Sequence, residues 1–125
     1  MLGSGRYGTR DIAGAIKFYD AIAEDLGAKR IMDIPDGAVY QGAQGGIFII
    51  GKPFEGEASV GNGAQIGFSA PSRAAVDAVH AKALSLGGKD EGKPGLRGPA
   101  EYGMYACYFR DLDGNKIIVN CVGPE

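Results

Sequence analysis

The sequence predicts an α+β fold in which two tandem βαβββ modules, about residues 1–51 and 61–122, form a curved sheet cleft with the helices outside. One observation is an internal repeat at an offset of 60 residues, which superposes two helices and their ends without a gap. Its matched positions include Ala15 with Ala75, Ala23 with Ala83, Leu26 with Leu86, and Gly27 with Gly87. The other is a closing hairpin over residues 105–122, because Asp113-Gly114 between two β-rich runs is a strong turn signal.

The first half begins with a strand within residues 1–9, followed by a helix from Asp11 to Leu26. The carboxylate of Asp11 can cap this helix, apolar residues recur along one of its faces, and Gly27 ends it. Residues 29–51 contain three short extended runs separated by turns rich in Pro and Gly. These runs predict a three-stranded meander.

The second half repeats this order after a polar connection over residues 52–62. Residues 63–70 alternate as a strand, Ser72 caps a helix that runs to Leu86, and residues 89–103 are predicted to be mostly loop with at most one short strand near their start. One face of each sheet must then meet its helix, which leaves the other face for a cleft. The predicted helix-facing positions are Tyr7, Ile66, Phe68, Ile117, Val119 and Cys121, and the cleft-facing positions are Ser4, Arg6, Gln65, Gly67, Ile118 and Asn120.

Length and charge narrow the class of partner. A chain of 125 residues with 45% hydrophobic content fits a single domain over residues 1–125. The net charge of −2 gives no electrostatic footprint for nucleic acid or an anionic membrane. Cys107 and Cys121 lie in strand-like runs without metal-ligand spacing and are predicted to be reduced thiols. We therefore expect a cytoplasmic protein with a small-molecule or protein partner.

Two segments carry a resemblance to a known family. The run DIAGAIKFYDAIAEDLGAK after the first strand and the run YFRDLDGNKI near the end resemble hallmarks of the vicinal oxygen chelate superfamily of glyoxalases, bleomycin-resistance proteins and extradiol dioxygenases. The closing run is similar to the family pattern FxxDPDGNxxE, with Leu112 in place of the usual Pro. The resemblance covers residues 1–122 and implies the same paired-module fold, a small-molecule ligand, and a lyase or isomerase activity of the lactoylglutathione-lyase kind.

The resemblance also places the positions at which metal-using members hold their ion. These fall on Ser4, roughly Ile49, Gln65 and Ile118, where the family would show His or Gln, Glu, His and Glu. An aliphatic side chain donates no lone pair, and a Gln amide is a weak ligand for a transition metal. We therefore predict a degenerate site with no metal ion and no cofactor. The lone histidine, His80, lies in the second helix and is predicted to be a packing or surface residue.

The cleft keeps polar and aromatic side chains that suit a small-molecule site. The predicted ligand-binding residues are Ser4, Arg6, Phe48, Gln65, Tyr105, Ile118 and Asn120, and no catalytic residue is assigned. Arg6 favours an anionic ligand, because a guanidinium binds carboxylate or phosphate through two hydrogen bonds, although an internal salt bridge is an equal alternative.

Three functions remain open from the sequence. The first is a glyoxalase-like lyase or isomerase, the second a metal-independent resistance or sequestration protein, and the third a domain used chiefly for dimerisation. Exposed sheet edges and apolar sheet margins also predict a homodimer.

Overall fold

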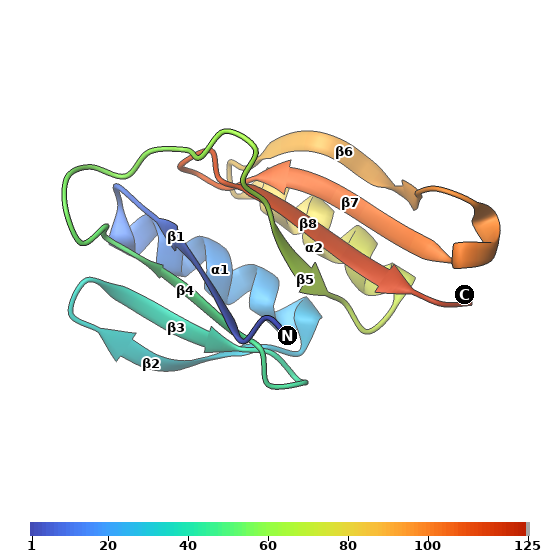
Figure 1. Cartoon of the computed structure of the whole chain (residues 1–125), viewed down its shortest axis with the longest axis horizontal. Helices are drawn as coiled ribbons and strands as arrows, with labels where there is room; N and C mark the ends of the chain where they lie inside the picture. The colour runs from blue at the N-terminus through green and yellow to red at the C-terminus, as the bar shows by residue number, and fades with distance from the viewer. Residues whose placement is uncertain (125) are drawn as a thin grey trace.

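The computed structural model, which describes residues 1–124, consists of two four-stranded sheets, each packed against one helix (Figure 1). Sheet A has the strand order β1-β4-β3-β2 and sheet B the order β5-β8-β7-β6. In both sheets the first strand pairs in parallel with the last, and the other neighbours are antiparallel. This α+β arrangement of two equivalent modules confirms the predicted fold class. The elements are β1 (Ser4–Gly8), α1 (Ile12–Leu26), β2 (Lys29–Ile34), β3 (Gly37–Gln41), β4 (Ile47–Gly51), β5 (Ile66–Ser69), α2 (Arg73–Ser85), β6 (Lys89–Leu96), the 3-10 helix η1 (Ala100–Tyr102), β7 (Met104–Arg110) and β8 (Lys116–Val122).

Both helices begin and end at the residues that the sequence indicates. The side chain of Asp11 accepts a hydrogen bond from the Gly14 N–H, and the side chain of Ser72 accepts one from the Ala75 N–H. Each bond satisfies a backbone donor that the first turn of a helix leaves free. Gly27 ends α1 in the left-handed conformation with φ 67°, which a residue without Cβ adopts at little cost.

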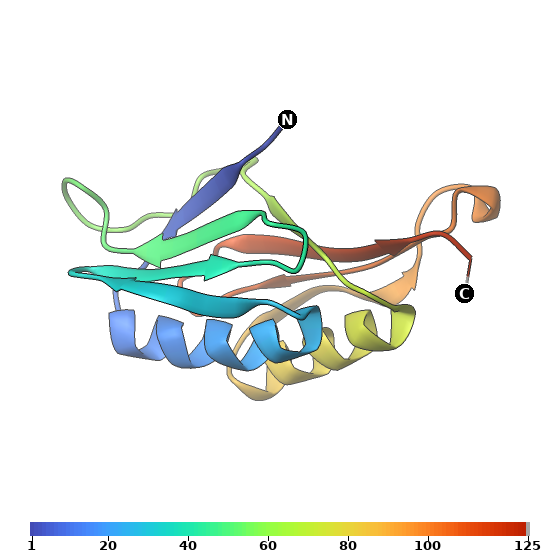
Figure 2. The same ribbon diagram turned by 90° about the horizontal axis from the view of Figure 1, so that it is seen from below.

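Both helices lie on the same side of the two sheets, next to each other (Figure 2). One core therefore runs between the helices and both sheets. Ile66 pairs with Ile117 and Phe68 with Val119 across β5 and β8, and these side chains belong to that core, as the alternation predicts. The helices contact each other as well as the sheets.

Strand β6 is longer than the sequence predicts. Residues 89–103 were expected to be mostly loop because of their Pro and Gly content, but β6 extends from Lys89 to Leu96 and pairs with β7 through two register shifts. Pairing with a strongly β-forming neighbour overrides weak intrinsic propensity. Pro94 is compatible with this strand because β6 is at the edge of sheet B, where a missing N–H need not break the ladder.

A buried carboxylate organises the turn between β7 and β8. Asp111 is 5% exposed, and its Oδ1 accepts hydrogen bonds from the backbone N–H groups of Asp113 and Asn115, each at 2.9 Å. Its Oδ2 accepts from the Tyr19 hydroxyl at 2.6 Å and from the Asn115 amide at 2.9 Å. The turn of the second module is thereby bonded to α1 of the first.

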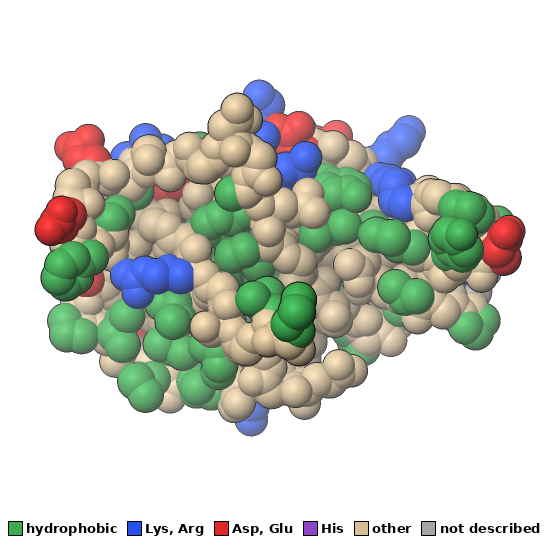
Figure 3. Space-filling view, in the orientation of Figure 1, with side chains coloured by type: hydrophobic (Ala, Val, Ile, Leu, Met, Phe, Trp, Pro, Cys, Tyr) green, Lys and Arg blue, Asp and Glu red, His purple; other side chains and the backbone are tan. Residues whose placement is uncertain are grey.

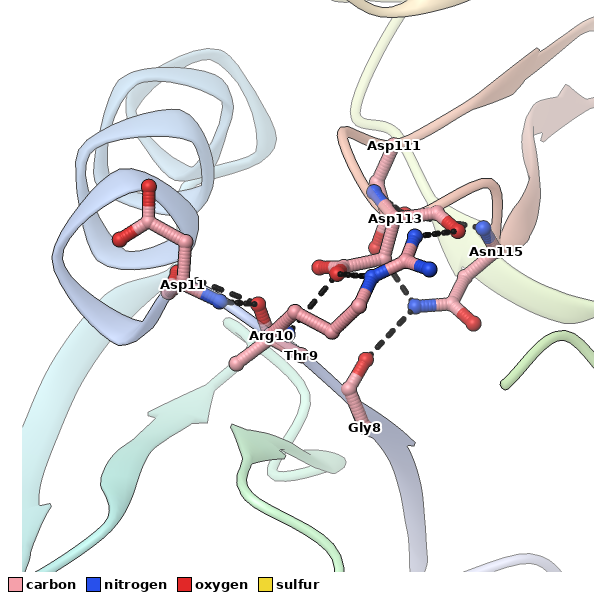
Figure 4. A network of polar contacts seen from close by, with 7 residues as sticks. All are labelled: Gly8, Thr9, Arg10, Asp11, Asp111, Asp113 and Asn115. Carbon is pink, nitrogen blue, oxygen red and sulfur yellow. Dashed lines mark hydrogen bonds and ion pairs between the residues drawn. The ribbon is translucent and has the colours of Figure 1, made fainter. Parts of the chain in front are cut away.

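The same turn also holds the junction between β1 and α1 (Figure 4). Asn115 Nδ2 donates to the Gly8 carbonyl at 3.0 Å. The Arg10 backbone N–H donates to Asp113 Oδ1 at 2.9 Å, and its guanidinium bonds to both the carboxylate and the carbonyl of Asp113. These contacts, between residues about a hundred positions apart, fix one module against the other.

Replacing Tyr19 by Phe should lower the free energy of unfolding by about 1.5–3 kcal/mol, because it removes a hydrogen bond to a buried carboxylate. Burial, followed by the charge of Asp111, raises the pKa of Tyr19 well above its usual 10.0. In the unfolded chain Tyr19 ionises above about pH 10, whereas in the folded protein it stays neutral, so the free energy of unfolding of wild type falls as the pH rises above about 10. The difference in free energy of unfolding between wild type and Tyr19→Phe should therefore shrink at high pH.

Urea unfolding at pH 7 and at pH 10.5 measures this gap. Tyr102→Phe is the matched control, because Tyr102 is 65% exposed and should lose little stability. A Tyr19→Phe protein as stable as wild type at pH 7 would contradict the role given to Asp111.

Candidate ligand-binding site

The open face of the protein is the side of both sheets turned away from the helices, and four predicted site residues lie on it. Strand alternation places Ser4 and Arg6 of β1 there, opposite Ile47 and Ile49 of β4. In sheet B the same alternation places Ile118 and Asn120 of β8 on this face, opposite Gly67 and Ser69 of β5. Gln65 is exposed and comes directly before β5.

Phe48 and Tyr105 lie on the other side of the sheets, toward the helices. The Phe48 ring is buried with its centroid 4.8 Å from that of Tyr19 on α1. The Tyr105 hydroxyl donates to Asp77 on α2 at 2.6 Å, and Arg73 lies over its ring. The structure therefore does not bring these two aromatic residues together with Arg6 and Asn120.

Arg6 uses part of its guanidinium within the chain. Its Nη2 donates to the carbonyl of Lys52 at 2.6 Å, and the residue is exposed. Arg6 forms no ion pair with an Asp or Glu of residues 1–124. The internal salt bridge that the sequence left open as an alternative to ligand binding is therefore not observed among these residues. The remaining donors face solvent on the open face.

A cationic cluster around Tyr108 is the feature that the sequence analysis missed. Tyr108 pairs with Ile118, so its ring is on the open face. The Arg97 guanidinium carbon lies 5.6 Å and the Lys116 Nζ 5.4 Å from the ring centroid, within the range of cation–π attraction. Only the register of the hairpin, which pairs Tyr108 with Ile118 and Tyr105 with Cys121, shows that Tyr108 rather than Tyr105 shares this face.

Two glycines leave room for Arg97 to lie across sheet B. A Cβ at Gly92 would be 3.3 Å from Arg97 Nη2, and a Cβ at Gly95 would be 3.1 Å from Nη1. The guanidinium is further held by the Lys93 carbonyl, which accepts from Nη2 at 2.6 Å. Arg97 is therefore a positioned cation rather than a freely rotating one.

The positive charge of this cluster is not neutralised within the described part of the chain. Neither Arg97 nor Lys116 makes an ion pair in residues 1–124. The neighbouring Arg110 does, with Glu91 at 2.6 Å, and this hydrogen bond lowers the pKa of the Glu91 carboxyl. Glu91 is thus charged at neutral pH but engaged with Arg110.

The side chains at the family's metal positions do not fit a divalent ion. Ile49 and Ile118 supply no donor atom, which leaves the hydroxyl of Ser4 and the amide of Gln65. Across residues 1–124, no three His, Cys, Asp or Glu side chains gather in a way that could hold a metal ion.

His80 and Cys107 serve the packing of sheet B rather than this site. His80 is buried, with Nε2 2.9 Å from Asp90 Oδ1, and so fastens α2 to β6, in keeping with the predicted packing role. Cys107 is a free, buried thiol whose pKa burial raises to about 11, which makes it a poor nucleophile at neutral pH.

Comparison with known families gives one match over most of the chain. Residues 5–119 match the family model described as Glyoxalase/Bleomycin resistance protein/Dioxygenase superfamily. No curated protein matches the chain. No helix in residues 1–124 has the length and apolar character needed to cross a membrane.

Several solved structures share the fold. A glyoxalase/bleomycin resistance protein from Albidiferax ferrireducens is 34% identical, with a TM-score of 0.88 and 99% of each chain covered. A glyoxalase/bleomycin resistance protein/dioxygenase family enzyme from Burkholderia phytofirmans is 18% identical, with a TM-score of 0.71 and 98% of each chain covered. A putative glyoxalase from Bacillus halodurans is 16% identical, with a TM-score of 0.71, 97% of this chain covered and 95% of the other. The last two similarities establish the fold alone.

The donor set predicts that the purified protein will not retain stoichiometric Ni²⁺ or Zn²⁺ after dialysis against a chelator. The Ser4 hydroxyl and the Gln65 amide are neutral oxygen donors, and binding to these two groups offsets too little of the free energy that the ion loses on dehydration. Elemental analysis of the dialysed protein measures this directly. One equivalent of metal that is lost when Gln65 is changed to Ala would contradict it.

Proposed function

This chain belongs to the Glyoxalase/Bleomycin resistance protein/Dioxygenase superfamily, and we propose that it binds a small organic anion on its open face without using a divalent metal ion. The observation that carries this proposal is the pair of cations, Arg97 and Lys116, held against Tyr108 without an acidic partner in residues 1–124. A carboxylate or phosphate would supply the missing negative charge.

The surroundings of the cluster suit a small molecule with an apolar body. Ile118 and Ala106 lie on the same face as Tyr108 but are buried, so the Tyr108 ring is the apolar surface of the cluster, and Asn120 adds an amide that can donate or accept.

Binding is a better account of this site than turnover. The lyase or isomerase activity that the family name suggests would need donors that Ile49 and Ile118 do not provide. Glu91, whose pKa is lowered by the hydrogen bond from Arg110, is a weak proton acceptor. We therefore place a metal-independent resistance or sequestration role ahead of catalysis.

Removing the Arg97 charge should weaken a bound anion by roughly 10- to 150-fold, which corresponds to the 1.5–3 kcal/mol typical of a charged hydrogen bond. Isothermal titration of a panel of aromatic and aliphatic carboxylates and phosphate monoesters against wild type and Arg97→Ala measures the change. Lys17→Ala is the control, since it removes one positive charge from an exposed position on α1. Equal affinities for wild type and Arg97→Ala, or no anion bound by wild type, would contradict the proposal.

We also propose that the protein is a cytoplasmic homodimer that buries the open face of sheet A. Val39, Ile47 and Ile49 are partly exposed on this face, and Met32, paired with Val39, is 55% exposed. A contiguous apolar face of this kind is typical of an interface between proteins. Both cysteines are free, as is usual in reducing compartments.

Ile49→Asp should convert the dimer to a monomer, because it would bury an unpaired charge in the proposed interface. Light scattering at micromolar concentration measures the mass, and circular dichroism checks the fold. Val60→Asp is the control, since Val60 is 46% exposed in the connection between the modules. A monomeric wild type, or a dimer that survives Ile49→Asp, would show that sheet A is not the interface.

A further inference from the structure

A cavity of about 420 Å³ lies where the two sheets meet, beside the C-terminal half of α1. Tyr19 and Ile22 of α1, Tyr40 and Phe48 of sheet A, and Ile66 and Phe68 of β5 form its walls. Its mouth is formed by residues near the N-terminus, the turn between β3 and β4, and the end of β5. Figure 3 shows the hollow at the lower centre of the molecule, next to the N-terminal residues.

The cavity exists because β1 and β5 do not pair with each other. They are the edge strands of two separate sheets, and side chains alone bridge them. Gly5 of β1 approaches Ile66 so closely that a Cβ there would be 3.1 Å from Ile66 Cδ1. Next to this contact the sheets diverge and leave a space that the core side chains do not fill.

The walls present ring carbon rather than polar atoms. Phe48 has its ring centroid 4.8 Å from that of Tyr19 and 5.1 Å from that of Phe68, so three rings surround one side of the space. The Tyr19 hydroxyl is occupied by Asp111, and the Tyr40 hydroxyl donates to Asp20 at 2.8 Å. Neither tyrosine therefore has its O–H proton free to donate to a ligand.

None of the described residues that line the cavity is charged. The polar side chains among them are at the mouth, where Ser4, Gln44 and Ser69 are exposed to solvent. A charged ligand would lose its hydration here without gaining a partner, which disfavours it strongly. A neutral aromatic molecule would instead gain ring contacts on several sides.

We propose that this cavity binds a neutral, mainly apolar molecule that contains an aromatic ring, at a site separate from the anion on the open face. The volume falls within the range of about 300–1,000 Å³ typical of small-molecule pockets. Arg97, Lys116 and Tyr108 are not among the lining residues, so the two sites differ in both position and charge. The exposed Leu2 at the mouth is placed to cover an apolar ligand.

Titration with the neutral fluorescent probe N-phenyl-1-naphthylamine tests the site. Wild type should bind one equivalent with a saturable rise in fluorescence. Ala23→Leu fills part of the cavity from α1 and should weaken the probe tenfold or more, whereas Ala13→Leu, on the exposed side of the same helix, should leave it unchanged. Ala70→Leu narrows the mouth of the cavity from a partly exposed position and should also weaken binding of the probe. This variant tests the site if Ala23→Leu does not fold.

Measurements on Arg97→Ala separate this site from the proposed anion site. The probe should bind Arg97→Ala as tightly as wild type, and excess benzoate should not displace it. The inference is overturned if folded wild type shows no saturable binding, if the folded cavity variants bind like wild type, or if Arg97→Ala weakens the probe. A wild type that binds the probe but no anion would reject the proposed function and leave the cavity site standing.

Discussion

The arrangement of the two modules depends on the buried carboxylate of Asp111. It accepts four hydrogen bonds, from two backbone N–H groups of its own turn, from Asn115 and from Tyr19 of the other module. A charge buried to this extent is tolerable only while those donors stay in place. Because Asn115 and Asp113 also bond to Gly8 and Arg10, the hairpin turn holds the junction between β1 and α1 against the second module. Both helices are thereby kept on one side and both open sheet faces on the other.

The features that could be predicted from the sequence are those with a local signal. Asp11, Ser72 and Gly27 specify helix ends through their own hydrogen bonds or backbone conformation, without help from the rest of the chain. The alternation at Ile66 and Phe68 specifies the buried face of β5, since a shift by one residue would expose both. The repeat then extended these assignments from one module to the other, which is why the fold class followed before any tertiary contact was known.

The features that could not be predicted are those that depend on pairing between strands. β6 forms against β7 despite Gly92 and Pro94, so its own composition was a poor guide. Strand β4 carries apolar side chains on both faces, and the sequence alone cannot say which face Phe48 takes. The sides of Tyr105 and Tyr108 follow from the register of the last hairpin, in which Tyr105 pairs with Cys121 and Tyr108 with Ile118. Arg97 joins Tyr108 only through the pairing of β6, so no sequence spacing reveals the cluster.

Because side chains alternate along a strand, the charged side chains of β7 and β8 lie on one face of the sheet, opposite a face that is uncharged. On β7 and β8, one set of side chains points to the helices and is uncharged, while the other carries Tyr108 and Lys116 on the open face. The cationic cluster belongs to the second set, whereas the cavity lies between α1, sheet A and β5 and is lined by no residue of β7 or β8. A substitution at Tyr108 or Lys116 therefore alters the cationic cluster and leaves the cavity intact, because neither residue lines the cavity. Ile49 and Ile118 likewise belong to the open face, and neither takes part in the Asp111 network.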